Sequence, residues 1–400
     1  AKDNKTKKSI KDLFFDALPL FFTSPIEALI PDPSTNTRYI HSLFGLMKED
    51  VTSITYSFSS IFLEILRYIK KNWRMLVSDI ETGTINSTVE MSDEVRESLS
   101  KKIQPMPERA QKLREIFEEH ENDQFVPMMW PNLKVVTGVG TGGFTNYSNK
   151  IIDEFTGSSL NFFFMGLNAS EGVFSIPVKL NTHDAILVPD SMFYEFLELD
   201  SDNPEDVKTL DQLEVGKSYE IITTNLSGFY RYKMRDAIKV TGMFNETPII
   251  DFLYRIDKNI NLFGEKTTEE MITGVLSKVE KEFGLNIIDF SMWGEEEDTI
   301  RYICLIEIEA LPDNINLYEV QQRIDELTCE ANLSFGYRRD RDELKPIDLK
   351  VLQPETYLLY KDLMVAKGAP ASQLKPPRII INDIHKRFFL ALQEPDLKVE

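Results

Sequence analysis

Apolar residues recur in the first quarter of the chain at the three- and four-residue steps of an amphipathic helix. In "SSIFLEILRYIKKNW" this stripe comprises Phe62, Ile65, Leu66, Ile69 and Trp73. A stripe of this kind puts apolar side chains on one face, and it is far more often core than a ligand site. We therefore predict a core helix over 59–73, preceded by turn-rich segments such as "FFTSPIEALIPDPSTNT".

From residue 104 to residue 164 the pattern alternates between helix and strand. A helical stretch is followed by the strand-like run "LKVVTG", the glycine-rich turn "GVGTGG", the helical run "NYSNKIIDEF" and a second strand, "NFFFMG". Alternation of this type builds sheets that are flanked by helices. The first half of the chain is therefore predicted to be α/β.

After residue 172 the pattern becomes rich in strands. Apolar and polar residues alternate in "VFSIPVKL" and "AILVPD", and the runs "SYEIITTN", "FYRYKM" and "DAIKVTG" follow. Past residue 265 helices and strands are mixed in the way of a compact α+β unit. We predict a large N-terminal domain (1–256) with a β-rich subdomain, a hinge (257–264) and a small C-terminal domain (265–400).

Composition and charge exclude several classes of function. The formal net charge of −20 argues against sequence-independent binding to nucleic acid, which needs clustered Lys and Arg. No apolar run is long enough to span a membrane. The two cysteines, Cys304 and Cys329, are too few and too far apart for a disulfide framework or a zinc ribbon, so we expect a reducing, cytoplasmic location.

The glycine-rich turn is the most conspicuous motif. Gly138, Gly140 and Gly143 follow a predicted strand and precede a predicted helix, in the spacing of a dinucleotide-binding turn. Such a turn should be followed about 20 residues later by an acid, but Glu171 lies 28 residues beyond Gly143. A turn that brings the backbone close to another ligand, or a tight turn without a ligand, therefore remains open.

A second candidate site follows the strand "NFFFMG". The segment "GLNASEG" places Ser170 and Glu171 in the loop at the carboxyl end of that strand, where ligands gather in α/β sheets. A carboxylate there can hold Mg²⁺ against nucleotide phosphates, beside a hydroxyl donor. The alternative is a surface loop in which Ser170 caps a turn.

The stretch "GFYRYKMRDAIKVTG" contains one carboxylate, Asp236, among four basic residues. One interpretation is a hairpin whose charges form solvated ion pairs of little energetic weight. The other is a carboxylate that accepts two hydrogen bonds from a sugar diol.

Two further segments carry unusual patterns. "YRIDKNINLFGEK" joins the two predicted domains, and its charged pattern differs from the Gly/Ser/Pro-rich composition of flexible linkers, which favours a hinge with defined positions. Near the C-terminus, Lys375 precedes two prolines that fix its loop and exclude a helix. An exposed lysine usually serves only solubility.

Taken together, these segments resemble the auxin-responsive Gretchen Hagen family of acyl-acid amido synthetases. The segments that carry the resemblance occur in family order and cover nearly the whole chain: "TSPIEALIPDP", "HSLFGLM", "IKKNWRMLVSDIETGTIN", "MWPNLK", "ASEG", "FYRYKMRD", "GEKTTEE", "FGYRRDR" and "GAPASQLKPPRI". That family belongs to the adenylate-forming superfamily, which implies a luciferase-like architecture with a small mobile C-terminal domain.

The resemblance implies a role for several residues. Glu171 would bind Mg²⁺, with Ser170 near phosphate or the substrate carboxylate, and Asp236 matches the family's ribose ligand. Arg255 and Asp257 look like the superfamily's hinge pair, and Lys375 matches a lysine that contacts phosphate during adenylation. Further candidates are Tyr232, Gly140, Thr141 and Arg255 for nucleotide binding, Gly264 for the hinge, and Phe58 and Phe62 for an acyl pocket.

The resemblance also implies a reaction. A small carboxylic acid would be adenylated with ATP and Mg²⁺, and the acyl group would pass to an amine, an amino acid in this family, with release of AMP and pyrophosphate. The alternatives are a nucleotide-binding relative without ligase activity and a ligase with a thiol acceptor. We expect small-molecule partners, no nucleic acid or membrane partner, and a monomer or weak dimer.

Three features depart from the family pattern. The family's first motif, a Ser/Gly/Thr-rich phosphate loop, does not occur in residues 1–22. Either the motif lies upstream of residue 1, as we expect, or it is absent, which would argue against catalysis. Leu167 stands where many members have a tyrosine. Arg235 replaces the glycine before Asp236.

Overall fold

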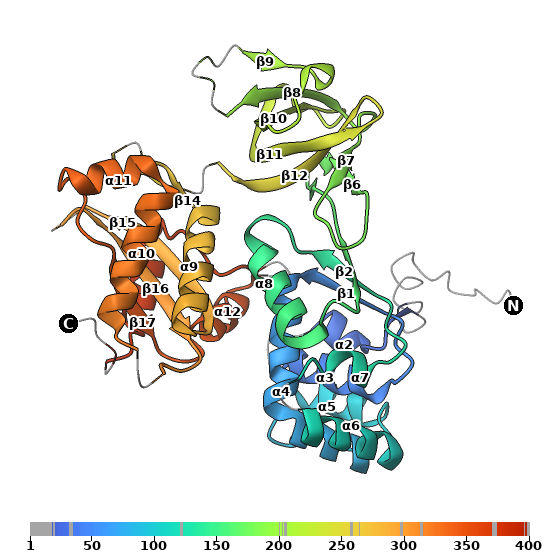
Figure 1. The fold of residues 1–400 in the computed structure, drawn as a ribbon. Helices are drawn as coiled ribbons and strands as arrows, with labels where there is room; N and C mark the ends of the chain where they lie inside the picture. Colours follow the sequence, from blue (N-terminus) through green and yellow to red (C-terminus); the bar gives the residue numbers. More distant parts are fainter. Residues whose placement is uncertain are drawn as a thin grey trace, which may run out of the picture. The chain divides into compact units, whose positions relative to one another are not determined.

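A computed structural model describes residues 18–397, apart from 19–20, 32–34, 121–122, 200, 202, 204–205, 257–258, 264, 297–298, 313–314, 370–373 and 396. The chain forms two compact units. Unit 1 consists of residues 1–139 and 147–164, and unit 2 consists of residues 140–146 and 165–400 (Figure 1).

Unit 1 contains a parallel three-stranded sheet of order β1-β2-β3, with β1 (Ser53–Phe58), β2 (Val135–Val139) and β3 (Asn161–Phe164). Its longest helix is α4 (Ser59–Thr82), which begins directly after β1 and packs on α3 and α6. The remaining helices are α2 (Ile26–Leu29), α3 (Thr37–Met47), α5 (Asp93–Ser100), α6 (Pro107–His120) and α7 (Val126–Met129). Between β2 and β3 the chain forms the 3-10 turn η1 (Gly142–Phe144), which belongs to unit 2, then helix α8 (Thr145–Lys150) and the π-helical turn η2 (Ile151–Thr156).

Aromatic side chains form a continuous line through the core of unit 1. Trp73 of α4 stacks on Phe117 of α6 with ring centroids 5.4 Å apart. Phe117 meets Phe125 edge to face at 5.4 Å, and Phe125 meets Phe155 of η2 at 5.6 Å. Offset and edge-to-face geometries of this kind add to the stabilisation that burial provides. The predicted core helix is confirmed, since Phe62, Leu66, Ile69 and Trp73 are buried and Ile65 is half-buried.

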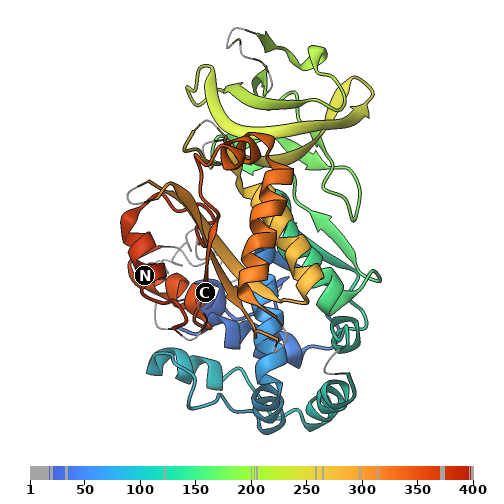
Figure 2. The ribbon, with the colours of Figure 1, turned by 60° about the vertical axis from the view of Figure 1, so that its left-hand side comes forward.

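The first part of unit 2 is a seven-stranded antiparallel sheet of order β6-β7-β12-β11-β10-β8-β9. Its strands are β6 (Ser175–Pro177), β7 (Ala185–Leu187), β8 (Phe193–Glu198), β9 (Val207–Lys208), β10 (Ser218–Thr224), β11 (Tyr232–Phe244) and β12 (Thr247–Arg255), with the 3-10 turn η3 (Leu210–Gln212) after β9. The small hairpin β4 (Asn168–Ala169) and β5 (Gly172–Val173) precedes it. The two long strands β11 and β12 are strongly curved (Figure 2), and their pairing slips in register at two places.

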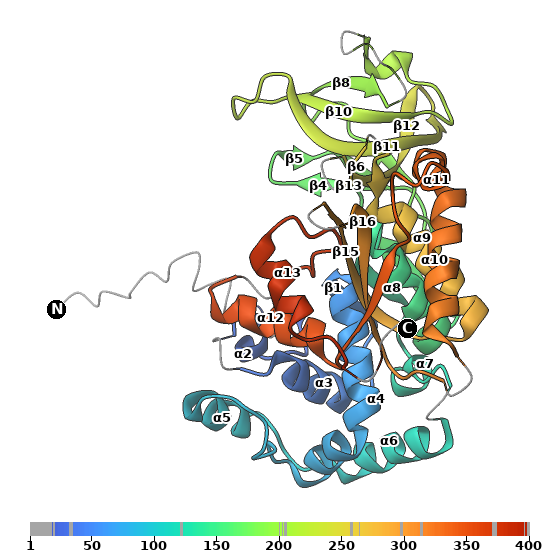
Figure 3. The same ribbon diagram turned by 90° about the vertical axis from the view of Figure 1, so that its left-hand side faces the viewer.

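The second part of unit 2 is a three-stranded sheet of order β15-β16-β17, with β15 (Ile287–Glu295), β16 (Arg301–Ile308) and β17 (Asp348–Leu352). Helices α9 (Glu269–Phe283) and α10 (Leu317–Ala331) cover one face, and α12 (Thr356–Ala366) and α13 (Asp383–Leu390) cover the other (Figure 3). The short helix α11 (Leu333–Asp340) follows α10. Alternate strand residues face the two sides: Met292 and Cys304 pack with α9 and α10, whereas Trp293 and Leu305 pack with α12 and α13.

The connection between the two sheets is attached to the second one. Strand β13 (Asn259–Ile260) pairs with β14 (Thr267–Thr268), and Ile260 lies in the core under α9 and α10. The buried carboxylate of Glu265 accepts hydrogen bonds from the backbone amides of Leu262 at 2.7 Å and Phe263 at 2.6 Å, and from the Tyr302 hydroxyl at 2.6 Å. A single side chain therefore closes the 259–267 loop onto β16.

The structure confirms the predicted mixed α/β fold, with helix-flanked sheets, a β-rich part and a C-terminal α+β part. Several elements were not predicted: residues 53–58 form strand β1, which lies next to β2, and the antiparallel sheet contains β8 and β12 in addition to the expected strands. The runs "FYRYKM" and "DAIKVTG" contribute to one strand, β11, instead of two. Within the described residues, no helix has both the length and the apolar character needed to cross a lipid bilayer.

Candidate functional site

Asp236 lies at the centre of the candidate site, and its partner comes from the neighbouring strand. Asp236 of β11 is directly opposite Arg255 of β12. The Arg255 guanidinium donates from Nε to Oδ1 at 3.0 Å and from a terminal nitrogen to Oδ2 at 3.4 Å. Asp236 is 3% exposed, whereas the Arg255 side chain is 51% exposed. The carboxylate is therefore buried behind a cation that presents further N–H donors to solvent.

Two of the four bases around Asp236 are paired with other acids. Arg231 donates to Glu195 at 3.0 Å, and Arg235 donates to the nearly buried Glu220 at 3.3 Å. Neither of these two ion pairs includes Asp236. The simple hairpin interpretation, in which Asp236 is a solvated surface carboxylate, is wrong because Asp236 is buried.

A β-bulge orients Asp236. Glu220 of β10 pairs with Ala237 and Ile222 pairs with Lys233, so one residue of β10 faces three residues of β11, Met234 to Asp236. Arg235, in the middle of this bulge, has a left-handed φ of 59°. Bulges bend a strand and re-aim its side chains, and the left-handed region favours glycine. This geometry explains why a glycine suits the position that Arg235 occupies.

Ser170 and Glu171 form the two-residue turn of the β4–β5 hairpin, in which Ala169 pairs with Gly172. Asn225, at the end of β10, fixes this turn: its Nδ2 donates to the Glu171 carbonyl at 3.0 Å. The Asn225 side-chain oxygen also accepts from the amides of Ser227 at 3.0 Å and Phe229 at 3.3 Å. We did not identify Asn225 from the sequence, although "NLSG" is a typical turn signal.

Three of the predicted residues act electrostatically on a fourth, Arg255. The hydrogen bond with Asp236 raises the pKa of Arg255, and the negative charges of Glu171 and Tyr232 contribute to the same shift. Tyr232 is half-exposed, and its ring lies 4.8 Å from that of Phe229. Glu171, Tyr232 and Asp236 thus lie near the Arg255 guanidinium, and Ser170 is adjacent to Glu171 in the sequence.

The glycine turn lies against β12. A side-chain carbon added at Gly142, whose φ is 57°, would meet the Phe252 ring at 2.7 Å. Within unit 1, a carbon added at Gly138 would meet the Tyr56 ring at 2.2 Å. Both glycines therefore have a packing reason, which supports the interpretation as a tight turn. Gly140 is buried and Thr141 is half-buried in the same turn.

Lys375 lies in the segment that follows α12. Its side chain is exposed, and its ammonium nitrogen stands 4.2 Å from the centre of the Phe144 ring of η1. A cation over an aromatic face at this distance is favourable. The structure therefore places Lys375 beside the glycine turn.

The remaining predicted residues have other positions. Phe62 is buried and stacks on Tyr56 at 5.4 Å, and Phe58 is half-buried at the start of α4. Both therefore take part in the packing of unit 1. Asp257 and Gly264, the predicted hinge residues, lie outside the described residues.

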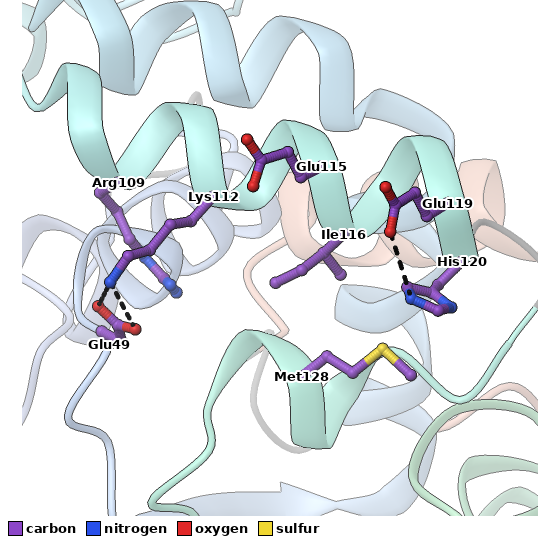
Figure 4. A pocket seen from close by; sticks show the side chains of 8 residues that line it. All are labelled: Glu49, Arg109, Lys112, Glu115, Ile116, Glu119, His120 and Met128. Atoms are coloured by element: carbon purple, nitrogen blue, oxygen red, sulfur yellow. Dashed lines mark hydrogen bonds and ion pairs between the residues drawn. The ribbon is translucent and has the colours of Figure 1, made fainter.

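A separate hollow in unit 1 contains none of the predicted residues (Figure 4). It has a volume of about 340 Å³ and is lined by Glu49, Arg109, Lys112, Glu115, Ile116, Glu119, His120 and Met128. Lys112 is paired with Glu49 at 3.1 Å. The buried Arg109 donates to the carbonyls of Leu46 and Met129, both at 2.8 Å, so it joins α3, α6 and α7. These contacts give the hollow a structural explanation.

The residues around Arg255 have the chemistry that a nucleotide requires. An ionised carboxylate has about four lone-pair positions, so Asp236 can accept from Arg255 and from a ribose diol. Mg²⁺ bound to nucleotide phosphates typically takes one or two protein carboxylates and keeps several waters. Glu171, in a fixed turn beside a serine hydroxyl, fits the role of such a single carboxylate ligand.

Comparisons with known proteins agree with this fold. The GH3 family N-terminal domain matches residues 4–160, the GH3 family central domain matches residues 185–255, and the GH3 family C-terminal domain matches residues 270–384. These three models together cover most of a mixed α/β chain with a central antiparallel sheet. The chain belongs to the GH3 family.

Named relatives are similar over most of this chain. The 4-substituted benzoates-glutamate ligase GH3.12 of Arabidopsis thaliana is 26% identical, over 90% of this chain and 65% of the relative. The indole-3-acetic acid-amido synthetase GH3.3 of the same organism is 27% identical, over 90% and 62%. The jasmonoyl--L-amino acid synthetase GH3.5 of Oryza sativa subsp. japonica is 26% identical, over 89% and 64%. The chain thus spans slightly less than two thirds of the length of these relatives.

Solved structures share the fold. The GH3.15 acyl acid amido synthetase superimposes with a TM-score of 0.79 at 21% identity, over 97% of this chain and 71% of that chain. The AtGH3.15 acyl acid amido synthetase in complex with 2,4-DB gives a TM-score of 0.74 at 22% identity, over 90% and 65%.

Proposed function

We propose that this protein is an ATP-dependent acyl-acid amido synthetase. It would adenylate a small carboxylic acid with ATP and release pyrophosphate. An amine, here an amino acid, would then attack the acyl carbon and release AMP, which leaves an amide. The observation that carries the proposal is the grouping of Glu171, Tyr232 and Asp236 around Arg255, in a chain of a family whose named members are amido synthetases.

Each group has a defined part in this proposal. Asp236 and Arg255 hold the ribose, with Tyr232 beside them, and Ser170 donates to phosphate. Glu171 would hold Mg²⁺, which neutralises charge on phosphate oxygens when it is bound. Gly140 and Thr141 lie along the nucleotide, and Lys375 contacts the α-phosphate. Catalysis is then mainly alignment of the acid with that phosphate and stabilisation of the developing negative charge.

The domain arrangement belongs to the same proposal. Residues 1–256 would bind the acid and the nucleotide, with Phe58 and Phe62 in an acyl pocket. Residues 265–400 would carry Lys375 and turn about a hinge at 257–264 that includes Asp257 and Gly264. Such a step between half-reactions would remove the lysine and open a path for the amine.

The reaction is tested by a screen of carboxylic acids against amino acids. The acids include indole-3-acetate, jasmonate and benzoates with substituents at position 4, and AMP release and product mass are measured. We expect AMP and an amide in equal amounts for at least one pair. A thioester formed with an added thiol would identify the thiol-acceptor alternative. Absence of acid-dependent exchange between labelled pyrophosphate and ATP would identify a relative without ligase activity.

The site is tested with three alanine variants. Glu171→Ala and Asp236→Ala should each lower pyrophosphate exchange by about 100-fold or more, because each removes a charged group that aligns ATP. Glu246→Ala, an exposed acid in the β11–β12 turn, is the matched control and should keep normal exchange. Normal exchange in either site variant would contradict the assigned role.

A further inference from the structure

The chain is attached to strand β15 immediately after Lys375. The Ser291 hydroxyl donates to the Pro377 carbonyl at 2.5 Å. The Met292 amide donates to the Arg378 carbonyl at 2.7 Å, and the Ile380 amide donates back to the Met292 carbonyl at 2.9 Å. These bonds place residues 377–380 along β15 as a short parallel addition to the sheet.

The Arg378 side chain secures this attachment from inside the domain. It forms an ion pair with Asp289 of β15, and both side chains are 8% exposed. The guanidinium also lies over the Phe290 ring, 4.2 Å from its centre. Asp289 in turn accepts from the Phe290 amide at 2.7 Å. Because a buried charge that loses its partner is strongly unfavourable, this pair holds Arg378 in one place.

The position of Arg378 determines the position of the Lys375 backbone. The two residues between them are Pro376 and Pro377, whose rings fix φ near −65°. A displacement at Arg378 is therefore passed to Lys375 with little relaxation. Lys375 itself is exposed, and its ammonium lies over the Phe144 ring.

We propose that Arg378 is a positioning residue for Lys375: its buried ion pair with Asp289 fixes the backbone from which Lys375 reaches the phosphates of ATP. This inference rests on the proposed function, in which Lys375 contacts ATP. It adds a residue pair that does not touch the nucleotide and that acts through the two prolines.

The test measures protection of Lys375 by Mg-ATP. Lysine amines are reductively methylated with and without saturating Mg-ATP, and the extent of labelling at each lysine is read by peptide mass spectrometry. In the unaltered protein, Mg-ATP should slow the labelling of Lys375. In Asp289→Asn this protection should fall by about tenfold, because a displaced Lys375 no longer lies against the bound phosphates.

A matched variant separates positioning from general destabilisation. Arg339 and Asp325 form a similar ion pair in the same part of unit 2, at 2.8 Å, and join α11 to α10. Asp325→Asn should lower the thermal midpoint but keep the protection of Lys375. Ser291→Ala, which removes the hydroxyl that holds Pro377, is a milder second variant, and it decides the question if Asp289→Asn does not fold.

The outcomes are distinguishable. Loss of protection in Asp289→Asn and Ser291→Ala, with protection kept in Asp325→Asn, supports the inference. Full protection of Lys375 in Asp289→Asn overturns the inference but leaves the proposed function standing. The same conclusion follows if Asp325→Asn loses as much protection of Lys375 as Asp289→Asn does. Absence of protection in the unaltered protein would instead refute the role of Lys375 in the proposed function, and the inference would fall with it.

Discussion

The left-handed backbone at Arg235 allows a sharp prediction about the bulge that orients Asp236. Arg235 has φ 59°, in a segment where one residue of β10 faces three of β11. We compare Arg235→Gly with Arg235→Ala. Both variants remove the ion pair with Glu220, so the loss of that contact is common to the two and cancels in the comparison. The difference in stability between the two variants therefore reports only the conformational preference of the backbone at residue 235.

The size of the difference follows from two opposing effects. A left-handed conformation costs an L-residue about 1–2 kcal/mol, which glycine avoids. Alanine regains about 0.4–1 kcal/mol because its unfolded chain has fewer conformations to lose. We therefore expect Arg235→Gly to be more stable than Arg235→Ala by about 1 kcal/mol, which corresponds to about a fivefold difference in the equilibrium for opening.

Hydrogen exchange measured by mass spectrometry provides a local assay. Peptides that cover β10 and β11 should exchange about fivefold more slowly in Arg235→Gly than in Arg235→Ala. Peptides from α6, in unit 1, should exchange equally in both and serve as the internal reference. Equal exchange in β11, or slower exchange in Arg235→Ala, would refute the claim that the bulge requires a left-handed residue.

Two further predictions concern buried carboxylates of unit 2. Glu265→Gln should lower the free energy of unfolding by about 2–3 kcal/mol, because an amide cannot accept all three hydrogen bonds that Glu265 receives; an unchanged urea midpoint would contradict this. Burial, and then the negative charge of Asp184, raises the pKa of Asp251 to about 6. Protonated Asp251 therefore stabilises the folded state below the pKa that this carboxyl has in the unfolded chain, and this stabilisation is lost as the pH rises towards 6. Asp251→Asn should therefore lose less stability than the unaltered protein between pH 4 and pH 6, and parallel thermal-midpoint profiles would disprove this assignment.

The periodicity of apolar residues predicted those helices and strands whose pattern can be recognised within one short stretch of sequence. The stripe from Phe62 to Trp73 gave α4, although the helix continues to Thr82, and "LKVVTG" and "NFFFMG" correspond to β2 and β3. Strand β1 was missed although its six residues, "SITYSF", alternate polar and apolar side chains and the apolar ones are less exposed. The position of β12 between β7 and β11 depends on contacts between segments far apart in sequence, which periodicity cannot encode.

The candidate site was predicted as a set of residues but not as a geometry. The sequence could indicate Glu171 and Asp236 as carboxylates of the right type, and it indicated Arg255 as part of a hinge. The ion pair between Asp236 and Arg255 arises because these two residues pair across β11 and β12, and the register there follows from the packing of the whole sheet. No pattern in the sequence indicated the ion pair of Arg378, since its partner Asp289 is remote in sequence.

Trp293 gives the molecule an intrinsic optical reporter. Of the three tryptophans, Trp73 and Trp130 lie in unit 1, whereas Trp293 is buried in β15 and packs in one cluster with Ile380. Replacing the other two with phenylalanine would leave an indole whose fluorescence senses the surroundings of the segment that follows Lys375. Emission from Trp293 could then report, in real time and without added dye, whether residues 377–380 stay packed on β15 when nucleotide is added.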